Sequence, residues 1–323
     1  MPPMLAYIVA FAVVLVVSII LVPVFMKIAV KTDFTDKPTE RKKHKSPVPL
    51  SGGIAMFVAF LVGFLAFVIR LDSSMPYLLV GAAMIVGVGF VDDLSKARGI
   101  EFPVWPRLMV HIAAACVAFA GNIRFTGFFN HFTEVYVYLP IWLQFILTVL
   151  WIVGLVTVFN FMDGLDGLSG LLALVAGSTF FVVALHMGQP ESAFLAAIFV
   201  AAVAGFLCFN LPPAKVYMGD SGAYLLGFIL AAISLHGAFK QATVVSLAIP
   251  MLAMGVPIFD GVLVVVRRIL ARKPAYIADS TDITHLHFRL LKTGLSPRHT
   301  VLLIFLISTC LSLTSIILML TFQ

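Results

Sequence analysis

An asparagine and two aspartates follow one another at three-residue spacing in the stretch NFMDGLDGL, residues 160–168. On a helical turn Asn160, Asp163 and Asp166 would share one face, because side chains three positions apart are neighbours there. Mg²⁺ prefers oxygen ligands and usually takes one or two carboxylates. The row therefore predicts a hard-cation site. The alternative is a capped polar turn, which explains one aspartate but not both together with the asparagine.

A pair of adjacent aspartates, Asp92 and Asp93, stands at the end of an apolar run in the stretch GFVDDLSK, residues 89–96. Neighbouring carboxylates repel each other and are costly to remove from water. At the C-terminal end of a helix they also oppose the helix dipole. One interpretation is a solvated helix end. The other is that a cation compensates them, either a metal ion or the nearby Lys96 and Arg98.

Asp220 stands at the start of another apolar run, in the stretch VYMGDSG. An aspartate in this position can cap the N-terminus of the helix that follows. Gly219 and Gly222 on either side indicate a second role, because glycine lets the backbone approach a ligand closely. Both interpretations stay open on the residues alone.

Asp260 is unusual because it lies inside an apolar run. Ionisable residues in such segments are rare and indicate function. Pro257 and Gly261 are typical of a kinked or broken helix whose freed backbone groups line a cavity. We predict that Asp260 contacts substrate, the alternative being a structural partner for Arg267 or Arg268.

A basic segment, residues 33–53, ends in the pair Gly52 and Gly53 at the start of an apolar run. One interpretation is a topology anchor that contacts anionic lipid headgroups. The glycines favour a phosphate cradle, because they permit close backbone approach and leave amide N–H groups facing an anion. Lys42, His44, Gly52 and Gly53 are therefore predicted to bind substrate.

The segment 267–299 contains the stretch HLHFRLL, with His285, His287 and Arg289. A His-x-His pair can bind a metal, and its imidazoles can also bind phosphate. Arg289 is adjacent and no third metal ligand is near in the sequence, so anion binding is favoured over zinc. The apolar residues among them predict a short amphipathic piece at the membrane surface.

These polar residues interrupt a chain that is 61% hydrophobic and only 11% charged, a composition that excludes an ordinary soluble protein. Most of its apolar runs reach the roughly 17–25 residues of a membrane-spanning helix. We predict an all-α, polytopic membrane protein with a single domain over residues 1–323. About ten spans are expected, at 4–26, 49–69, 75–91, 106–120, 140–159, 168–185, 192–209, 221–235, 243–266 and 300–320.

The basic residues sort to one side of such a ten-span arrangement. The other side carries only Arg70, Arg124 and Lys240 of the 21 Lys and Arg residues. By the positive-inside rule the basic side is cytoplasmic, which puts both termini outside. The net charge of +6 therefore reflects topology and does not indicate nucleic-acid binding. Acidic residues do not obey this rule, so the acidic motifs on the cytoplasmic side indicate a catalytic surface there.

Taken together, these motifs resemble the polyprenyl-phosphate N-acetylhexosamine-1-phosphate transferase family, whose members initiate lipid-linked cell-envelope polysaccharides. The resemblance covers nearly the whole chain and is carried by FVDDL at 90–94, NFMDGLDGL at 160–168, VYMGDSG at 216–222, VPIFD at 256–260 and HLH at 285–287. It implies a multi-pass enzyme of the bacterial cytoplasmic (inner) membrane with Mg²⁺ or Mn²⁺. It also implies a UDP-N-acetylhexosamine donor, undecaprenyl phosphate as acceptor, surrounding membrane lipid and compatibility with a homodimer.

The resemblance also implies roles for the acidic residues. Asp166 and Asp220 correspond to the metal-coordinating pair. Asp92 and Asp93 correspond to the acidic pair assigned to the acceptor phosphate, as base or as nucleophile. All four are expected at the cytoplasmic face.

The remaining motif residues are implied on the donor side. His285, His287 and Arg289 resemble the group that holds the donor diphosphate, with the two histidines counted as catalytic. Asn160 and Asp163 would orient the uridine or support the metal.

Two features of the last motif bear on the sugar. The sugar-transferring branch often reads His-x-His-His, whereas this chain has Phe288 at the last position. The peptidoglycan branch tends to read His-His-His-Phe-Glu, whereas this chain has Leu286 and Arg289. We therefore favour UDP-N-acetylglucosamine, or a related UDP-N-acetylhexosamine, over the donor of phospho-N-acetylmuramoyl-pentapeptide transferase.

Two functions of other classes also fit many spans. A secondary transporter would explain Asp260 and the Pro and Gly breaks, but transporters usually show repeats and place polar residues near the bilayer midplane. A non-catalytic scaffold would leave the acidic motifs unexplained. The collection of acids on one side favours an enzyme.

Overall fold

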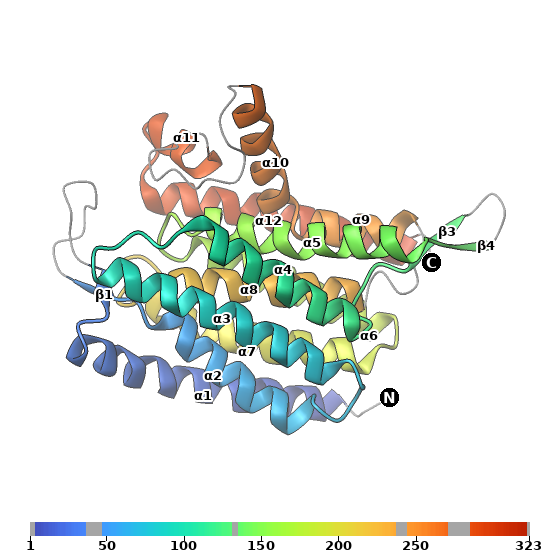
Figure 1. Cartoon of the computed structure of the whole chain (residues 1–323), viewed down its shortest axis with the longest axis horizontal. Helices are drawn as coiled ribbons and strands as arrows, with labels where there is room; N and C mark the ends of the chain where they lie inside the picture. The colour runs from blue at the N-terminus through green and yellow to red at the C-terminus, as the bar shows by residue number, and fades with distance from the viewer. Residues whose placement is uncertain (1–3, 37–46, 131–134, 237–243, 271–284, 322–323) are drawn as a thin grey trace.

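The structure is a computed structural model that describes residues 4–36, 47–130, 135–236, 244–270 and 285–321. Lys42 and His44, two of the predicted substrate-binding residues, lie outside this part of the chain. Helices dominate the described residues (Figure 1). Their bounds are α1 Met4–Lys31, α2 Gly52–Phe67, α3 Met75–Ala97, α4 Val104–Ala120, α5 Ile141–Met162, α6 Leu168–His186, α7 Pro190–Asn210, α8 Gly219–His236, α9 Val244–Ala253, α10 Gly255–Leu270, α11 Leu286–Lys292 and α12 Pro297–Thr321.

Seven of these helices, α1, α3, α5, α6, α7, α8 and α12, are long and apolar enough to cross a membrane by length and composition. The shorter helices α2 and α4 are also apolar. The ninth predicted run is divided into α9 and α10. Each predicted apolar run thus contains helix, and the long helices support a multi-pass membrane protein.

The division of the ninth run lies at Met254, between α9 and α10. Pro257, which we expected at the break, instead falls in the first turn of α10. Proline is tolerated there because the N–H groups of the first turn have no partner inside the helix. The break is therefore displaced by a few residues from the predicted position.

At the centre of the bundle lies α8, in which every residue is buried. It packs mainly against α3 and α5, while α7 packs against α1 and α6. Small residues allow this close packing. A Cβ atom at Gly227 would lie 2.5 Å from the carbonyl oxygen of Leu155 and 2.6 Å from the Cα of Val156, both in α5. The acidic start of α8 is thereby held inside the bundle.

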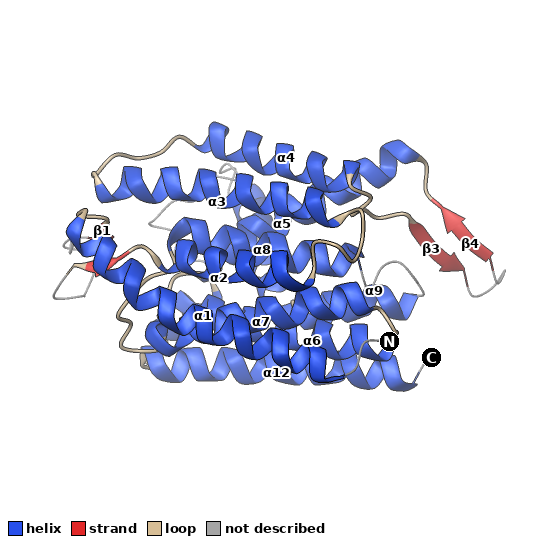
Figure 2. Cartoon of the chain, turned by 90° about the horizontal axis from the view of Figure 1, so that it is seen from below, coloured by secondary structure: helices blue, strands red, loops and turns tan. Residues whose placement is uncertain are grey.

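The described residues also form two short antiparallel strand pairs, which the all-helical prediction did not include. Strands β1 (Thr35–Asp36) and β2 (Val48–Pro49) pair at one end of the bundle, and β3 (Gly127–Asn130) and β4 (Val135–Tyr138) project from the other. Both chain termini lie at the β3–β4 end, as Figures 1 and 2 show. The hairpin β1–β2 and helix α11 lie at the opposite end.

Candidate functional site

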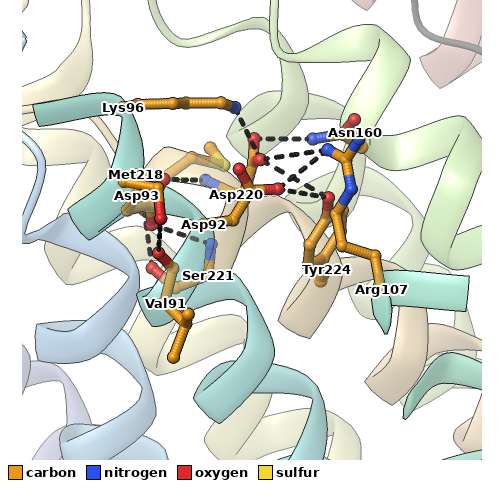
Figure 3. Close-up of polar contacts among 11 residues, drawn as sticks. Val91, Asp92, Asp93, Lys96, Arg107, Asn160, Met218, Asp220, Ser221 and Tyr224 are labelled. Atoms are coloured by element: carbon orange, nitrogen blue, oxygen red, sulfur yellow. Dashed lines mark hydrogen bonds and ion pairs between the residues drawn. The ribbon is translucent and has the colours of Figure 1, made fainter. Parts of the chain in front are cut away.

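Acidic side chains from α3 and α8 meet in one polar cluster (Figure 3). The end of α3 and the start of α8 lie at the end of the bundle opposite the termini (Figure 1). Asp92 and Asp93 lie in the last turns of α3 and are each 1% exposed. Gly89, one turn earlier, lies against the backbone of Ser221 at the start of α8, where a Cβ atom would collide. The two helices can therefore approach closely enough for the aspartates of α3 to reach the first residues of α8.

The carboxylate of Asp93 caps helix α8 from another helix. Its Oδ1 accepts the backbone N–H of Asp220 at 2.7 Å, and its Oδ2 accepts that of Ser221 at 3.0 Å. A negative charge at a helix N-terminus is favourable, because the first N–H groups have no partner inside the helix. Gly219 turns the chain into α8 with a φ of +68° and lies against this carboxylate. Asp93 thus positions the start of α8.

Asp92 contacts both α4 and α8. Its Oδ2 accepts hydrogen bonds from Arg107 Nη1 at 2.8 Å and from the Tyr224 hydroxyl at 3.4 Å. Its Oδ1 is buried and has no hydrogen-bond partner among the residues that the structure describes. An unpartnered buried carboxylate oxygen is costly, so this atom marks a place for a cation or donor.

Asp220 is the residue on which the polar contacts converge. Its Oδ2 lies 2.6 Å from Lys96 Nζ and 4.0 Å from Arg107 Nη1, and its Oδ1 accepts a hydrogen bond from Asn160 Nδ2 at 3.0 Å. The Tyr224 hydroxyl lies 3.4 Å from Oδ2, so one tyrosine contacts both Asp220 and Asp92. Helices α3, α4, α5 and α8 each contribute to this cluster.

The sequence suggested a metal ion, or Lys96 and Arg98, as compensation for Asp92 and Asp93. The structure instead places Lys96 on Asp220. The second cation, Arg107, was missed. It belongs to α4 and lies 15 residues from Asp92 in sequence, so no local spacing relates the two. Its signal in the sequence is an arginine in the first turn of a helix that is otherwise apolar apart from His111.

The row Asn160, Asp163 and Asp166 does not lie on one helical face, which corrects the predicted arrangement. Helix α5 ends at Met162, so only Asn160 is helical and reaches Asp220. Asp163 is the C-terminal cap residue of α5. Asp166 lies in the following turn, where its Oδ2 accepts the backbone N–H of Ala214 at 3.0 Å.

Burial raises the pKa of Asp163 to about 7, and the negative charge of Asp220 adds to this rise, whereas Lys96 opposes it. Because charges act on a pKa only over short distances, Asp163 lies in the field of the same cluster. The charges of the Asp220 cluster therefore act on Asp163, which makes Asp163 part of the site. Asp166, in contrast, is bonded to the loop at Ala214.

Asn210, at the end of α7, is a further residue that the sequence did not single out. Its Oδ1 accepts the N–H of Gly167 at 3.0 Å, and its Nδ2 donates to the carbonyl of Val216 at 2.8 Å. Gly167 has a φ of +77°, a left-handed conformation that favours glycine. Asn210 thus ties the aspartate-rich turn to the segment before Asp220.

The backbone amides of Gly52 and Gly53 donate to the carbonyls of Tyr217 and Met218, at 3.0 and 2.9 Å. They are therefore not available for an anion, which corrects the predicted phosphate cradle. The glycines serve packing instead, because a Cβ atom at Gly53 would lie 2.5 Å from the Cα of Gly222. The close approach that we inferred from glycine is present, but between two helices.

The last motif forms a second polar cluster. His285 Nδ1 lies 2.8 Å from Asp260 Oδ2, and the N–H of Leu286 donates to Asp260 Oδ1 at 2.6 Å. His287 is 0% exposed, and its two ring nitrogens have no hydrogen-bond partner within the described residues. Burial, followed by the neighbouring His285, lowers the pKa of His287 to about 4, so His287 is neutral at pH 7. Arg289, which follows on α11, is exposed.

The main cluster fits a hard divalent cation. Asp92 and Asp220 share Arg107 and Tyr224 as partners, and two cationic side chains already lie on these carboxylates. Oxygen donors of this kind suit Mg²⁺ or Mn²⁺. The unpartnered Asp92 Oδ1 offers one ligand atom. Across the described parts of the chain, no group of three or more His, Cys, Asp or Glu residues is arranged to hold a metal by itself, so further ligands would come from Asn160, substrate or water.

Comparison with known proteins relates the whole chain to one group of enzymes. The family model "Glycosyl transferase family 4" matches residues 75–238, which run from α3 to the end of α8. A protein of Bacillus subtilis, "Probable undecaprenyl-phosphate N-acetylglucosaminyl 1-phosphate transferase", is 35% identical over 98% of this chain and 86% of its own length.

More distant relatives fall into two branches. "Decaprenyl-phosphate N-acetylglucosaminephosphotransferase" of Mycobacterium tuberculosis is 32% identical over 83% of this chain and 72% of its own length. "Phospho-N-acetylmuramoyl-pentapeptide-transferase" of Listeria monocytogenes is 31% identical over 70% of this chain and 73% of its own length. The matched segment contains the Asp92–Asp220 cluster, whereas Asp260 and His285 lie beyond the family-model match.

Proposed function

This chain belongs to glycosyl transferase family 4, and on that premise we propose that it transfers N-acetylglucosamine 1-phosphate from UDP-N-acetylglucosamine to undecaprenyl phosphate. An oxygen of the lipid phosphate attacks the sugar-linked phosphorus, a new P–O bond forms, and the bond to the bridging oxygen breaks. The products are UMP and the undecaprenyl-diphosphate-linked sugar, the first lipid-linked unit of a cell-envelope polysaccharide.

The observation that carries the proposal is the pairing of cations with carboxylates at Asp92 and Asp220. Donor and acceptor are both anionic, so their approach requires positive charge at the reacting phosphates. Lys96 and Arg107 provide two such charges, held at 2.6 and 2.8 Å by Asp220 and Asp92. We assign to them the neutralisation of the incoming phosphates.

A strong base is not required for this reaction. The second pKa of a phosphate monoester is near 6, so the acceptor is largely a dianion at neutral pH. Asp92 can therefore act by holding Arg107 and a cation in place, and Asp93 acts by fixing the start of α8. We assign Asp163 to the support of the cation, and His287, which is neutral at pH 7, to the donor side of the site.

Asp220 is the proposed centre of the Mg²⁺ or Mn²⁺ site, with Asp92 and the amide oxygen of Asn160 as co-ligands. Asn160 already contacts Asp220, and an amide can present either of its two ends. The contacts favour these residues over Asp166, which is bound to the loop at Ala214. When bound, the cation supplies neutralisation of the donor diphosphate and stabilises the leaving UMP.

We further propose that the site faces the cytoplasm of a bacterial inner membrane, that ten segments span it, and that both termini lie outside. The end of α3 and the start of α8, which carry the cluster, lie at the end of the bundle opposite the termini (Figure 1). This agrees with the sorting of the basic residues to one side of the ten-span arrangement expected from the sequence. A homodimer and direct contacts with membrane lipid are part of this proposal.

The test is UMP release by the purified full chain with undecaprenyl phosphate, Mg²⁺ and a panel of donors. The panel contains UDP-N-acetylglucosamine, UDP-N-acetylgalactosamine and UDP-N-acetylmuramoyl-pentapeptide, the last because of the relationship to the Listeria protein. We expect turnover with UDP-N-acetylglucosamine, its loss in EDTA and its return with added Mg²⁺. No UMP with any donor would refute the proposal, and UMP only with the muramoyl donor would move the chain to the peptidoglycan branch.

A further inference from the structure

Asp260 and His285 form a buried carboxylate–imidazole pair outside the Asp92–Asp220 cluster. Asp260 lies in α10 and is 2% exposed, and His285, just before α11, is 6% exposed. Oδ2 of Asp260 lies 2.8 Å from His285 Nδ1, and Oδ1 accepts the N–H of Leu286 at 2.6 Å. Both carboxylate oxygens are therefore engaged by the segment that carries the histidine motif.

The hydrogen bond at Nδ1 has a consequence for the ring. A carboxylate only accepts, so Nδ1 must carry the proton, and Nε2 is the nitrogen left to meet a ligand. The neighbours fix the plane of the ring. Phe161 lies 5.0 Å from it between centroids, and the His287 ring stacks on it at 5.7 Å with an angle of 14°. The guanidinium carbon of Arg268 lies over the Phe161 ring, 5.6 Å from its centroid, and Arg268 is 4% exposed.

We infer that Asp260 is a positioning residue that holds His285 with Nδ1–H toward itself and the Nε2 lone pair toward a hydroxyl or amide N–H group of the UDP-sugar. This inference rests on the proposed function and deepens it. It replaces the direct substrate contact that the sequence suggests for Asp260, since the carboxylate is buried and both oxygens are bonded to the motif. Asp260 is then the link between α10 and the donor site.

Asp260→Asn separates positioning from folding. The asparagine oxygen can still accept the Leu286 N–H, and its NH₂ group can donate to Nδ1, so both hydrogen bonds persist. Because the asparagine NH₂ group donates to Nδ1, the ring proton moves to Nε2. Nε2 can then no longer accept a hydrogen bond from the substrate. In serine proteases the equivalent aspartate-to-asparagine change leaves the geometry intact and lowers kcat by about 10⁴ through the same tautomer effect.

The experiment measures UMP release and thermal unfolding for Asp260→Asn and for two His285 variants. For Asp260→Asn we expect kcat/KM for UDP-N-acetylglucosamine to fall by at least about 100-fold, with the melting temperature and the KM for undecaprenyl phosphate unchanged. His285→Asn places an amide near the Nδ1 position and should fold like wild type but lose turnover. His285→Gln extends an amide toward the Nε2 position and should keep more turnover than His285→Asn.

A matched control is Asp72→Asn. Asp72 forms another Asp–His pair, with its Oδ2 3.3 Å from His236 Nε2. It precedes α3, and Met75 at the start of that helix is about 26 Å along the axis from Asp92. Its replacement should leave turnover unchanged.

Two outcomes overturn the inference while the proposed function stands. One is wild-type turnover in Asp260→Asn or His285→Asn. The other is a loss of turnover in Asp260→Asn that is matched by a lower melting temperature and a raised KM for both substrates, as a merely structural role would produce. Absence of UMP release by the wild-type protein with every donor is a different result, because it overturns the proposed function and this inference with it.

Discussion

Replacing Arg107 by glutamine would remove the cation that the sequence did not reveal. Arg107 Nη1 donates to Asp92 Oδ2 at 2.8 Å, and the two side chains are 16% and 1% exposed. The other contact to this oxygen is the Tyr224 hydroxyl at 3.4 Å, and Oδ1 has no partner in the described chain. The variant therefore leaves a carboxylate that is buried and almost unpaired.

The magnitude of the effect follows from this burial. Removing one partner of a buried ion pair costs about 3–5 kcal/mol, because the remaining charge is uncompensated. Glutamine can still donate one neutral hydrogen bond, so we expect the lower end of that range for Arg107→Gln. For catalysis, removing one charge-stabilising donor typically lowers kcat by about 10²–10³.

The double variant Asp92→Asn, Arg107→Gln separates the two effects. Neutralising Asp92 removes the uncompensated charge, so most of the lost stability should return. Turnover should not return, because the positive charge needed at the phosphates is still absent. Arg107→Lys keeps the charge but loses the forked geometry, and it should fall between wild type and Arg107→Gln.

The assays are thermal or denaturant unfolding in detergent and UMP release under saturating substrates. A double-mutant cycle gives the coupling energy between Asp92 and Arg107. Stability losses that simply add, with no recovery in the double variant, would refute the inferred ion pair. Normal turnover in Arg107→Gln would refute its role at the phosphates.

Asp220→Asn should lower turnover by at least about 100-fold, whereas Asp166→Asn should lower it less if Asp92 and Asn160 are the co-ligands; equal losses with equal changes in Mg²⁺ dependence would favour Asp166 as a ligand. Gly53→Ala should lower stability by about 1–3 kcal/mol, because its Cβ atom would lie 2.5 Å from the Gly222 Cα, while Gly87→Ala, where nothing lies within 4 Å, is the neutral control; equal melting temperatures would contradict this packing. The raised pKa of Asp163, about 7 against an ordinary 3.8, means that the folded state binds a proton which the unfolded state releases between those values. Stability should therefore fall as pH rises through this window, and Asp163→Asn, measured in EDTA, should gain melting temperature over wild type from pH 4 to 7; a pH-independent difference would count against the raised pKa.

Much of the fold was predictable because its signals are local. A run of about twenty apolar residues predicts a membrane helix wherever its neighbours lie, and each predicted run contains helix in the structure. The resemblance to the transferase family was equally visible in short motifs, and the comparisons confirm it. Gly52 and Gly53 correctly indicated close approach, although the sequence could not say that the approaching group was another part of the protein.

The arrangement within the site was not predictable in the same way. The row from Asn160 to Asp166 looked like one helical face, but α5 ends at Met162. Asn160 therefore contacts Asp220, whereas Asp166 contacts the backbone of Ala214. The turn that follows α5 is held by Asn210, which lies 43 residues from Gly167 in sequence. No local period records such a contact.

The sequence by itself therefore determined the class of protein, the helices and the inventory of acids, because hydrophobicity and motif order are properties of the chain. The tertiary structure decided which groups act together. Asp93 became a cap for α8, Asp92 became the partner of Arg107, and Asp260 became the partner of His285. The physical reason is that a buried charge must find its partner in space, and helix packing alone determines which side chains come within hydrogen-bonding distance.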